Sequence, residues 1–271
     1  MGDGLRLALT TLTVAPVRGP AVLDRRVAGR AMALAPLVGL LAAVPVVAVL
    51  LTAQELTGQP LLASALAVTT LAALTRGLHL DGLADTVDGL GSYLPPAQAR
   101  LVMKKPDVGA LGLAAVVLTV LVQVTALSAA AQAQRGALAV VVAMVAGRLA
   151  VTLACTPATP AATPDGLGAL VAGTVRPQVA IAVSITVVVG LASYGGVDEP
   201  ALDGFRRLDA ARVLVALAVS LGAASLLRRH CVRRFGGLTG DVLGALLEAA
   251  TTVALVVMAC QLSPEAAPVA G

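Results

Sequence analysis

Three aspartates, Asp81, Asp85 and Asp88, follow directly after an apolar run that is long enough to enter a membrane. Their spacing of i, i+4 and i+7 places all three carboxylates on one face of a helix. Like charges so arranged repel one another and lose hydration near hydrocarbon, so a cation or a proton has to compensate them. The pattern predicts a Mg²⁺ site, because Mg²⁺ prefers oxygen ligands. The alternative is a solvated helix end.

A second acidic position follows the glycine-rich loop GGLTG at 236–240. Glycines let backbone amides approach a phosphate or a metal-bound oxygen. We therefore predict Asp241 as a further metal or substrate ligand, and Gly237 and Gly240 as substrate-binding residues. The alternative is a loop that only caps a helix, with Asp241 as the N-cap. Glu248 lies on the same helical face and is expected to be an intramembrane polar partner.

Three other polar residues have types suited to phosphate chemistry. His79 precedes Asp81 by two residues and is a candidate base for an attacking hydroxyl or a phosphate ligand, the alternative being a packed or interfacial residue. Asp88 is an equally plausible base. Lys104 stands in a loop rich in Gly and Pro, and is predicted to bind a phosphate. Arg148 lies inside an apolar stretch, where a charge costs roughly 2.5–3.5 kcal/mol and therefore needs a partner, such as a substrate phosphate or the acidic cluster.

The composition determines the class of protein. Of 271 residues, 58% are hydrophobic and 13% charged, and none is Trp. A soluble domain of this length needs more polar surface, whereas a helical bundle in lipid needs little outside its loops. We predict an all-α, polytopic membrane protein in which residues 1–271 form a single membrane-embedded catalytic domain.

Apolar stretches predict about seven transmembrane helices. The second stretch is short, and its continuation through the aspartate motif as one longer helix is left open. Residues 1–20 do not resemble a cleavable signal and predict a partly buried amphipathic segment. The seven stretches are 31–53, 60–75, 109–131, 136–155, 177–194, 211–227 and 241–262.

Basic residues gather in alternate loops, which predicts the orientation. They are concentrated before the first stretch, between the second and third, before the fifth and before the seventh, whereas the opposite side has an acid-rich stretch at 197–212. The excess of Lys and Arg marks the cytoplasmic side. The N-terminus is therefore expected in the cytoplasm and the C-terminus outside, with both acidic motifs facing the cytoplasm.

The charge pattern and the cysteines argue against nucleic-acid binding and against a structural disulfide. The formal charge is +4, but the basic residues lie between apolar segments without stacking aromatic residues, so nucleic-acid binding is not expected. Cys155, Cys231 and Cys260 form no CxxC pair, and their positions in or near apolar stretches predict free, buried thiols.

Five motifs resemble the integral-membrane cobalamin synthase family, the adenosylcobinamide-GDP ribazoletransferases. Their order and spacing match that family along nearly the whole chain, although Lys105 and Asp107 exchange the charges of its usual pattern and Asp165 replaces a common basic residue. The motifs are GLHLDGLADTVDGL at 77–90, MKKPDVGALG at 103–112, GRLAV at 147–151, DGLGAL at 165–170 and GGLTGDVLGA at 236–245.

The resemblance implies an enzyme that joins GDP-activated cobinamide to α-ribazole or its 5′-phosphate and releases GMP, a late step in cobalamin biosynthesis. It implies Mg²⁺ as cofactor, a multi-pass protein of the bacterial inner (cytoplasmic) membrane and an active site facing the cytoplasm. Asp81, Asp85, Asp88 and His79 would be catalytic, with the three aspartates and Asp241 as metal ligands. The oligomeric state is left open, with a homo-oligomer among the alternatives.

Two other functions are compatible with an aspartate cluster in a membrane protein. A CDP-alcohol phosphotransferase is disfavoured because Asp85 stands where its D-G-x-x-A-R signature requires Arg. An ion-coupled transporter, in which intramembrane acids carry protons or bind a coupling ion, would be indicated by internal repeats, and we find none.

Overall fold

The computed structural model describes residues 1–194 and 203–260. These residues form helices joined by loops, and they contain no strand beyond one isolated bridge between Ala161 and Leu238. The helices are α1 (Asp3–Leu12), α2 (Arg25–Ala33), α3 (Ala35–Thr57), α4 (Pro60–Leu74), α5 (Leu78–Gly91), α6 (Pro96–Val102), α7 (Ala110–Gln132), α8 (Gly136–Ala154), α9 (Gly166–Val171), α10 (Pro177–Tyr194), α11 (Asp203–Phe235) and α12 (Gly240–Ala259).

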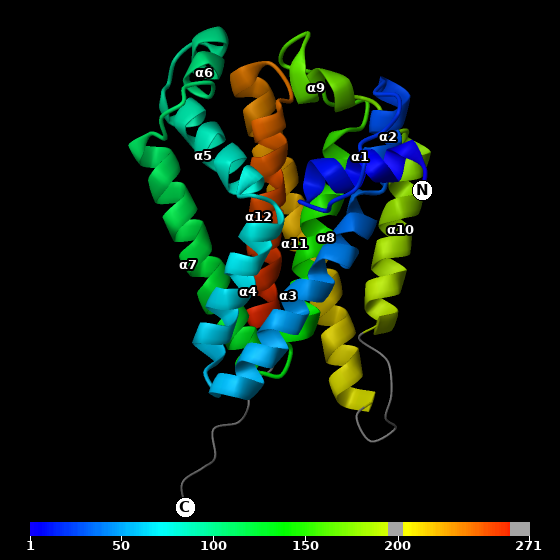
Figure 1. Cartoon of the computed structure of the whole chain (residues 1–271), viewed down its shortest axis with the longest axis vertical. Coiled ribbons are helices and arrows are strands. Elements are labelled where there is room, and N and C mark those ends of the chain that lie inside the picture. The colour runs from blue at the N-terminus through cyan, green and yellow to red at the C-terminus, as the bar shows by residue number, and fades with distance from the viewer. Residues whose placement is uncertain (195–202, 261–271) are drawn as a thin grey trace, which may run out of the picture.

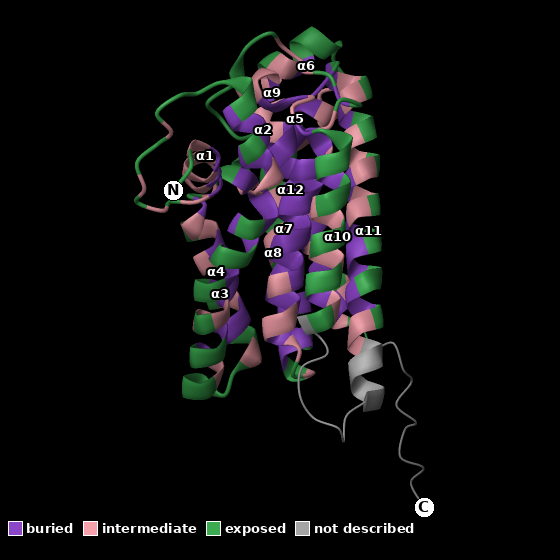
Figure 2. Ribbon diagram, turned by 90° about the vertical axis from the view of Figure 1, so that its right-hand side faces the viewer, coloured by how far each residue is buried: buried purple, intermediate pink, exposed green. Residues whose placement is uncertain are grey.

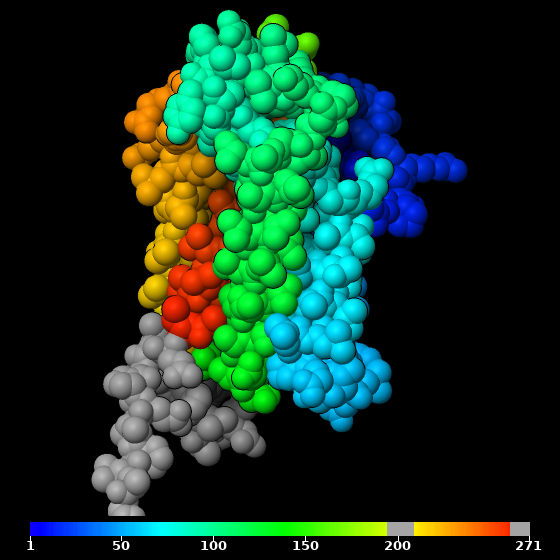
Figure 3. All heavy atoms as spheres, turned by 90° about the vertical axis from the view of Figure 1, so that its left-hand side faces the viewer, coloured from blue at the N-terminus to red at the C-terminus, as the bar shows by residue number. Residues whose placement is uncertain are grey.

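The long helices form a bundle around α8 and α12 (Figure 1). Helix α12 packs against α5, α7, α8 and α11, and α8 packs against α3. In their most apolar windows, 78% of α8 and 67% of α12 is buried, against only 22% of α7. Figure 2 shows the buried centre, and Figure 3 shows α7 crossing the outer surface. Helices α8 and α12 therefore form the core, and α7 presents most of its apolar surface outward, as expected in lipid.

Within residues 1–194 and 203–260, five helices are long and apolar enough to cross a membrane, and the pair α4 and α5 makes a sixth if it is counted as one bent span. The shorter apolar helix α10 lies along the bundle (Figure 2). The prediction of about seven spans is roughly consistent with this arrangement. The acid-rich stretch at 197–212 lies partly outside the described residues, as does the end of the last predicted span.

The chain bends by 86° between α4 and α5. The bend occurs at Arg76 and Gly77, which have φ angles of 53° and 69°. Both residues adopt the left-handed conformation, which ends the helix because the hydrogen-bond ladder cannot continue through it. The aspartate motif therefore does not extend the preceding span as one straight helix, and α5 instead leads outward to the end of the bundle that carries α6 and α9 (Figure 1).

The N-terminal segment forms the amphipathic helix that the sequence predicts. Helix α1 lies across the bundle and buries Gly4, Ala8 and Leu12, at i, i+4 and i+8 (Figure 1). Beyond it, the backbone N–H of Val14 donates to the carbonyl of Leu74 over 2.8 Å. This bond joins the N-terminal segment to the last residue of α4, just before the bend.

Candidate active site

Helices α5 and α12 cross with their backbones in close contact beside the aspartates. A Cβ atom on Gly82 would lie 2.8 Å from the carbonyl oxygen of Asp241, and one on Gly244 would lie 3.1 Å from that of His79. One glycine on each helix therefore permits a separation that larger residues would widen. The crossing brings the motif that contains Asp81 next to the start of α12.

The acidic side chains at this crossing share one electrostatic environment. Asp85 is partly buried and experiences the negative charges of Asp81, Asp241 and Asp88, whereas Asp81 is exposed. Asp241 in turn experiences the charges of Asp81 and Lys104. Among the described residues, no Lys or Arg forms an ion pair with Asp81, Asp85 or Asp241. The cluster therefore carries excess negative charge that favours a cation.

Asp88 has a different environment from the other acidic residues. Its Oδ2 accepts a hydrogen bond from the backbone N–H of Gly109 over 2.7 Å, and its Oδ1 accepts one from Gly112 over 2.8 Å. These are amides at the start of α7, which have no partner within their own helix. Both carboxylate oxygens of Asp88 thus connect the end of α5 to the beginning of α7. The predicted roles of Asp88 as metal ligand and base remain predictions without geometric support.

The described residues do not contain a ready group of three or more His, Cys, Asp or Glu side chains that could hold a metal ion. The available donors nevertheless fit Mg²⁺, which proteins usually bind through one or two carboxylates while water and substrate phosphates supply the other ligands. Asp81, Asp85 and Asp241 provide such carboxylates, and none of them is held in an ion pair with Lys or Arg among the described residues. Mg²⁺ binding therefore stays a prediction, compatible with these residues.

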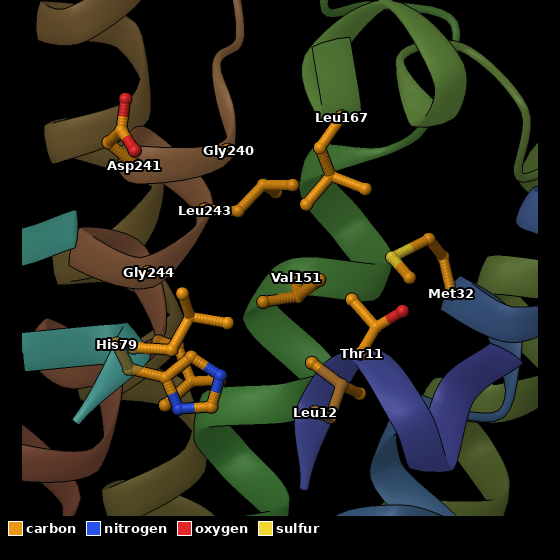
Figure 4. Close-up of a pocket in the computed structure, with 12 residues that line it drawn as sticks. Thr11, Leu12, Met32, His79, Val151, Leu167, Gly240, Asp241, Leu243 and Gly244 are labelled. Carbon is orange, nitrogen blue, oxygen red and sulfur yellow. The ribbon is translucent and has the colours of Figure 1, made fainter. Parts of the chain in front are cut away.

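His79 lies on the other side of α5 from the exposed Asp81. A separation of two residues turns the side chain about 200° around a helix. The imidazole is only 5% exposed, and its Nδ1 atom has no hydrogen-bond partner in the described structure. It lines a cavity that also reaches Asp241 (Figure 4). The structure therefore separates His79 from Asp81 but places it near the first turn of α12.

The two predicted basic phosphate ligands differ in access. Lys104 is exposed just after α6, within electrostatic range of Asp241. Arg148 is fully buried on α8, and none of its guanidinium nitrogens has a hydrogen-bond partner among the described residues. It is not among the residues that line the cavity beside His79. A direct phosphate contact is therefore compatible with the position of Lys104, whereas the geometry offers no support for one at Arg148.

A loop from the middle of the chain fixes the loop before α12. The N–H of Leu238 donates to the carbonyl of Pro160 over 2.8 Å, and the N–H of Ala162 donates to the carbonyl of Leu238 over 3.0 Å. Gly237 is buried where a Cβ atom would collide with the backbone of Ala161. Gly237 therefore serves this packing, and its predicted contact with substrate has no geometric support, whereas Gly240 lines the cavity.

The N-cap of α12 is Thr239 and not Asp241. The Thr239 hydroxyl accepts a hydrogen bond from the backbone N–H of Val242 over 3.1 Å. The simple capping alternative for Asp241 is therefore wrong, and its carboxylate lies in the first turn, where the helix dipole favours negative charge.

Sequence reasoning missed the glycines that form the helix crossing and the polar partner of Glu248. Gly82 follows Asp81 directly and Gly244 lies one turn after Asp241, so a small residue beside each acidic position was the available signal. The side-chain amide of Gln123 donates to Glu248 over 2.8 Å, and both residues are buried. This partner is on α7, far away in sequence.

The chain matches the family model described as cobalamin-5-phosphate synthase over residues 4–259. The chain belongs to this family. Proteins named adenosylcobinamide-GDP ribazoletransferase are similar along nearly their whole length. The protein from Frankia casuarinae is 47% identical over 94% of this chain and 93% of its own. The one from Nocardioides sp. is 40% identical over 96% of this chain and all of its own.

A third relative of the same name, from Corynebacterium efficiens, is 36% identical over 94% of this chain and 90% of its own. No solved structure matches the chain. Family membership, together with the apolar helices, identifies a multi-pass membrane enzyme of the transferase class that acts in cobalamin biosynthesis. It disfavours both the CDP-alcohol phosphotransferase and the transporter.

Proposed function

We propose that this protein transfers the cobinamide phosphate of adenosylcobinamide-GDP to a hydroxyl of α-ribazole or its 5′-phosphate. The observation that carries the proposal is the crossing of α5 and α12, which assembles uncompensated carboxylates from two of the motifs that the family resemblance rests on. The products are GMP and cobalamin or cobalamin 5′-phosphate. The printed names of the relatives support these substrates.

The reaction is a displacement at phosphorus. The ribose hydroxyl oxygen forms a bond to the phosphorus on the cobinamide side of the diphosphate, and the bond from this phosphorus to the oxygen of GMP breaks. GMP leaves with the electron pair, and the hydroxyl proton passes to a carboxylate of the cluster. Positioning and charge neutralisation lower the barrier of such a transfer more than covalent chemistry does.

Asp81, Asp85 and Asp241 are the residues that we assign to hold Mg²⁺ together with the diphosphate of the substrate. Bound Mg²⁺ would neutralise the non-bridging oxygens and the departing GMP. Lys104, exposed and close to Asp241, supplies a positive charge from the protein for the same phosphates. Asp88 keeps α5 and α7 in register and so positions the other acidic residues.

We further propose that the site faces the cytoplasm of a bacterial cell, with the protein in the inner membrane. Helices α2, α6 and α9 lie at the end of the bundle where α5 ends and α12 begins (Figure 1). The arginines of α2, Arg100 of α6 and the arginines at the end of α11 come to this same end. This distribution agrees with the excess of basic residues on cytoplasmic loops. Nucleotides and Mg²⁺ are abundant in that compartment.

The test is cobamide formation and GMP release by the wild-type protein in liposomes, supplied with adenosylcobinamide-GDP and α-ribazole 5′-phosphate. We expect both products in equal amounts, loss of both on chelation of divalent ions, and recovery when Mg²⁺ is added back. Absence of product from folded protein in lipid would refute the transferase reaction. Undiminished product in the presence of chelator would refute the role of the metal while leaving the reaction in place.

A further inference from the structure

A partly open cavity of about 250 Å³ lies directly beside the acidic crossing, bordered by α1, α2, α5, α8, α9 and α12. Its walls are mainly apolar, with Leu12, Met32, Val151 and Leu247 among them. Figure 4 shows the side chains from these helices converging from several directions. The carboxylate of Asp241 stands at the margin and points away from the middle of the cavity. The cavity therefore adjoins the acidic cluster but is itself an apolar compartment.

One polar side chain in the wall has no partner. The imidazole of His79 is 5% exposed, lies at the edge of the cavity opposite Leu167 (Figure 4), and leaves Nδ1 without a hydrogen bond in the described structure. Nδ1 is sealed from the cavity, whereas Nε2 is the ring nitrogen that stays accessible, and it has no hydrogen-bond partner among the described residues either. A ligand that bonds to Nε2 gains specificity as well as affinity. The cavity thus has apolar walls and one specific point for a hydrogen bond.

We propose that this cavity receives the heterocyclic base of the ribazole substrate and that His79 donates a hydrogen bond to the ring nitrogen not attached to ribose. This inference rests on the proposed function. A benzimidazole is a planar, mostly apolar bicycle with one free ring nitrogen, and both properties match the cavity. Its ribose would then extend past Gly240 toward the acidic cluster, where the phosphate transfer takes place. His79 thereby recognises the heterocycle of the substrate. This role replaces the one predicted from the sequence, in which His79 accepts the proton of the attacking hydroxyl.

The apolar walls and the single polar side chain distinguish the heterocyclic base from other possible occupants of the cavity. A lipid chain suits apolar walls but offers no acceptor to the Nε2 atom of His79, and GMP carries too many polar groups for walls made of Leu, Met and Val. The amphipathic helix α1 forms one side through Thr11 and Leu12, so the N-terminal segment acquires a function in substrate binding besides its position across the bundle.

Filling the cavity with a larger side chain at Thr11 tests whether the riboside binds there. Thr11→Phe places a larger side chain into the cavity, and we expect the KM for α-ribazole 5′-phosphate to rise about tenfold or more while the KM for adenosylcobinamide-GDP is unchanged. The matched control is Thr10→Phe, since Thr10 is equally half-buried on α1 but does not line the cavity. Equal effects of the two substitutions on the riboside KM would overturn the proposal.

The hydrogen bond to His79 is tested with the matching indole riboside, in which a C–H group replaces the free ring nitrogen. The wild type should favour the benzimidazole riboside at least about tenfold, and His79→Leu should reduce this preference toward one. An unchanged preference in the variant would refute the role of His79. If His79→Leu does not fold, the preference of the wild type alone decides, and equal use of both ribosides would refute it.

A binding measurement separates this inference from the proposed reaction. The chain has no Trp, so the ultraviolet fluorescence of a benzimidazole riboside can be followed with little background from the protein. Binding that is weakened by Thr11→Phe and not by Thr10→Phe supports the cavity even if no cobamide forms. Turnover by the wild type with equal riboside affinity in all three proteins supports the reaction but rejects this location for the base.

Discussion

Asp81 and Asp88 come from one motif, but their surroundings differ. Asp81 is exposed at the crossing with α12, whereas both oxygens of Asp88 accept backbone hydrogen bonds at the start of α7. Helical spacing predicted that the two residues lie on one face of a helix, and both do lie in the single helix α5. The hydrogen-bond partners come from a segment about twenty residues later, so helical periodicity could not reveal them.

Asp88→Asn tests the structural role of this residue. The amide nitrogen of Asn cannot accept, so one of the two bonds to α7 is lost and the melting temperature should fall, in line with a loss of about 1–2 kcal/mol. Thermal unfolding in detergent or nanodiscs measures the effect. The control is Asp107→Asn, because Asp107 is an exposed loop residue. Unchanged stability together with lost activity would instead indicate that Asp88 acts in catalysis.

At the scale of elements, the site depends on how closely α5 and α12 approach. Gly82 on α5 lies against the carbonyl of Asp241, so any side chain there forces the two backbones apart. A displacement of about 1 Å at a catalytic site can cost about a hundredfold in rate. We therefore expect the glycine beside the acidic residue to be as necessary to the proposed site as the carboxylates.

Gly82→Ala should lower the rate of GMP release about a hundredfold while the protein still inserts and folds. The control is Gly190→Ala in α10, where a Cβ atom meets nothing within 4 Å. Steady-state rates for both variants in liposomes provide the comparison. If the two variants are equally active, the close crossing is not required for the site.

The sequence predicted the apolar helices, the amphipathic N-terminal segment and the grouping of Asp241 with the first acidic motif. It did not predict the bend at Arg76 and Gly77, because hydropathy continues across a change in backbone direction. The sequence also did not predict which face of each spanning helix packs inside the bundle, because a helix such as α7 is apolar on its lipid side and on its packed side alike. The packing arises from contacts between segments that are distant in sequence.

At the scale of the whole molecule, the two ends of the bundle differ in charge and chemistry. The end with α6 and α9 carries the acidic crossing and the clustered arginines, and the last described residue of the chain lies toward the opposite end (Figure 1). Cys260 at that opposite end is exposed, so the expectation of three buried thiols is correct for Cys155 and Cys231 only.

Thiol labelling in intact cells tests this orientation. A membrane-impermeant maleimide should label Cys260 from outside the cell, because the residue is exposed beyond α12. Cys155, at the end of α8 nearer the acidic site, should stay unlabelled even in opened membranes, because its thiol is fully buried and a maleimide cannot reach it. Labelling of Cys260 only after the cells are opened would reverse the orientation.

The most direct test of the account compares GMP release by Asp81→Asn, Asp241→Asn and Glu55→Gln in one liposome assay with Mg²⁺. Asp81 and Asp241 belong to different helices that meet at one crossing, whereas Glu55 is exposed near the end of α3. We predict that each Asn variant loses at least about a hundredfold in rate and that Glu55→Gln keeps the wild-type rate. Wild-type activity in folded Asp241→Asn would contradict a site shared by α5 and α12.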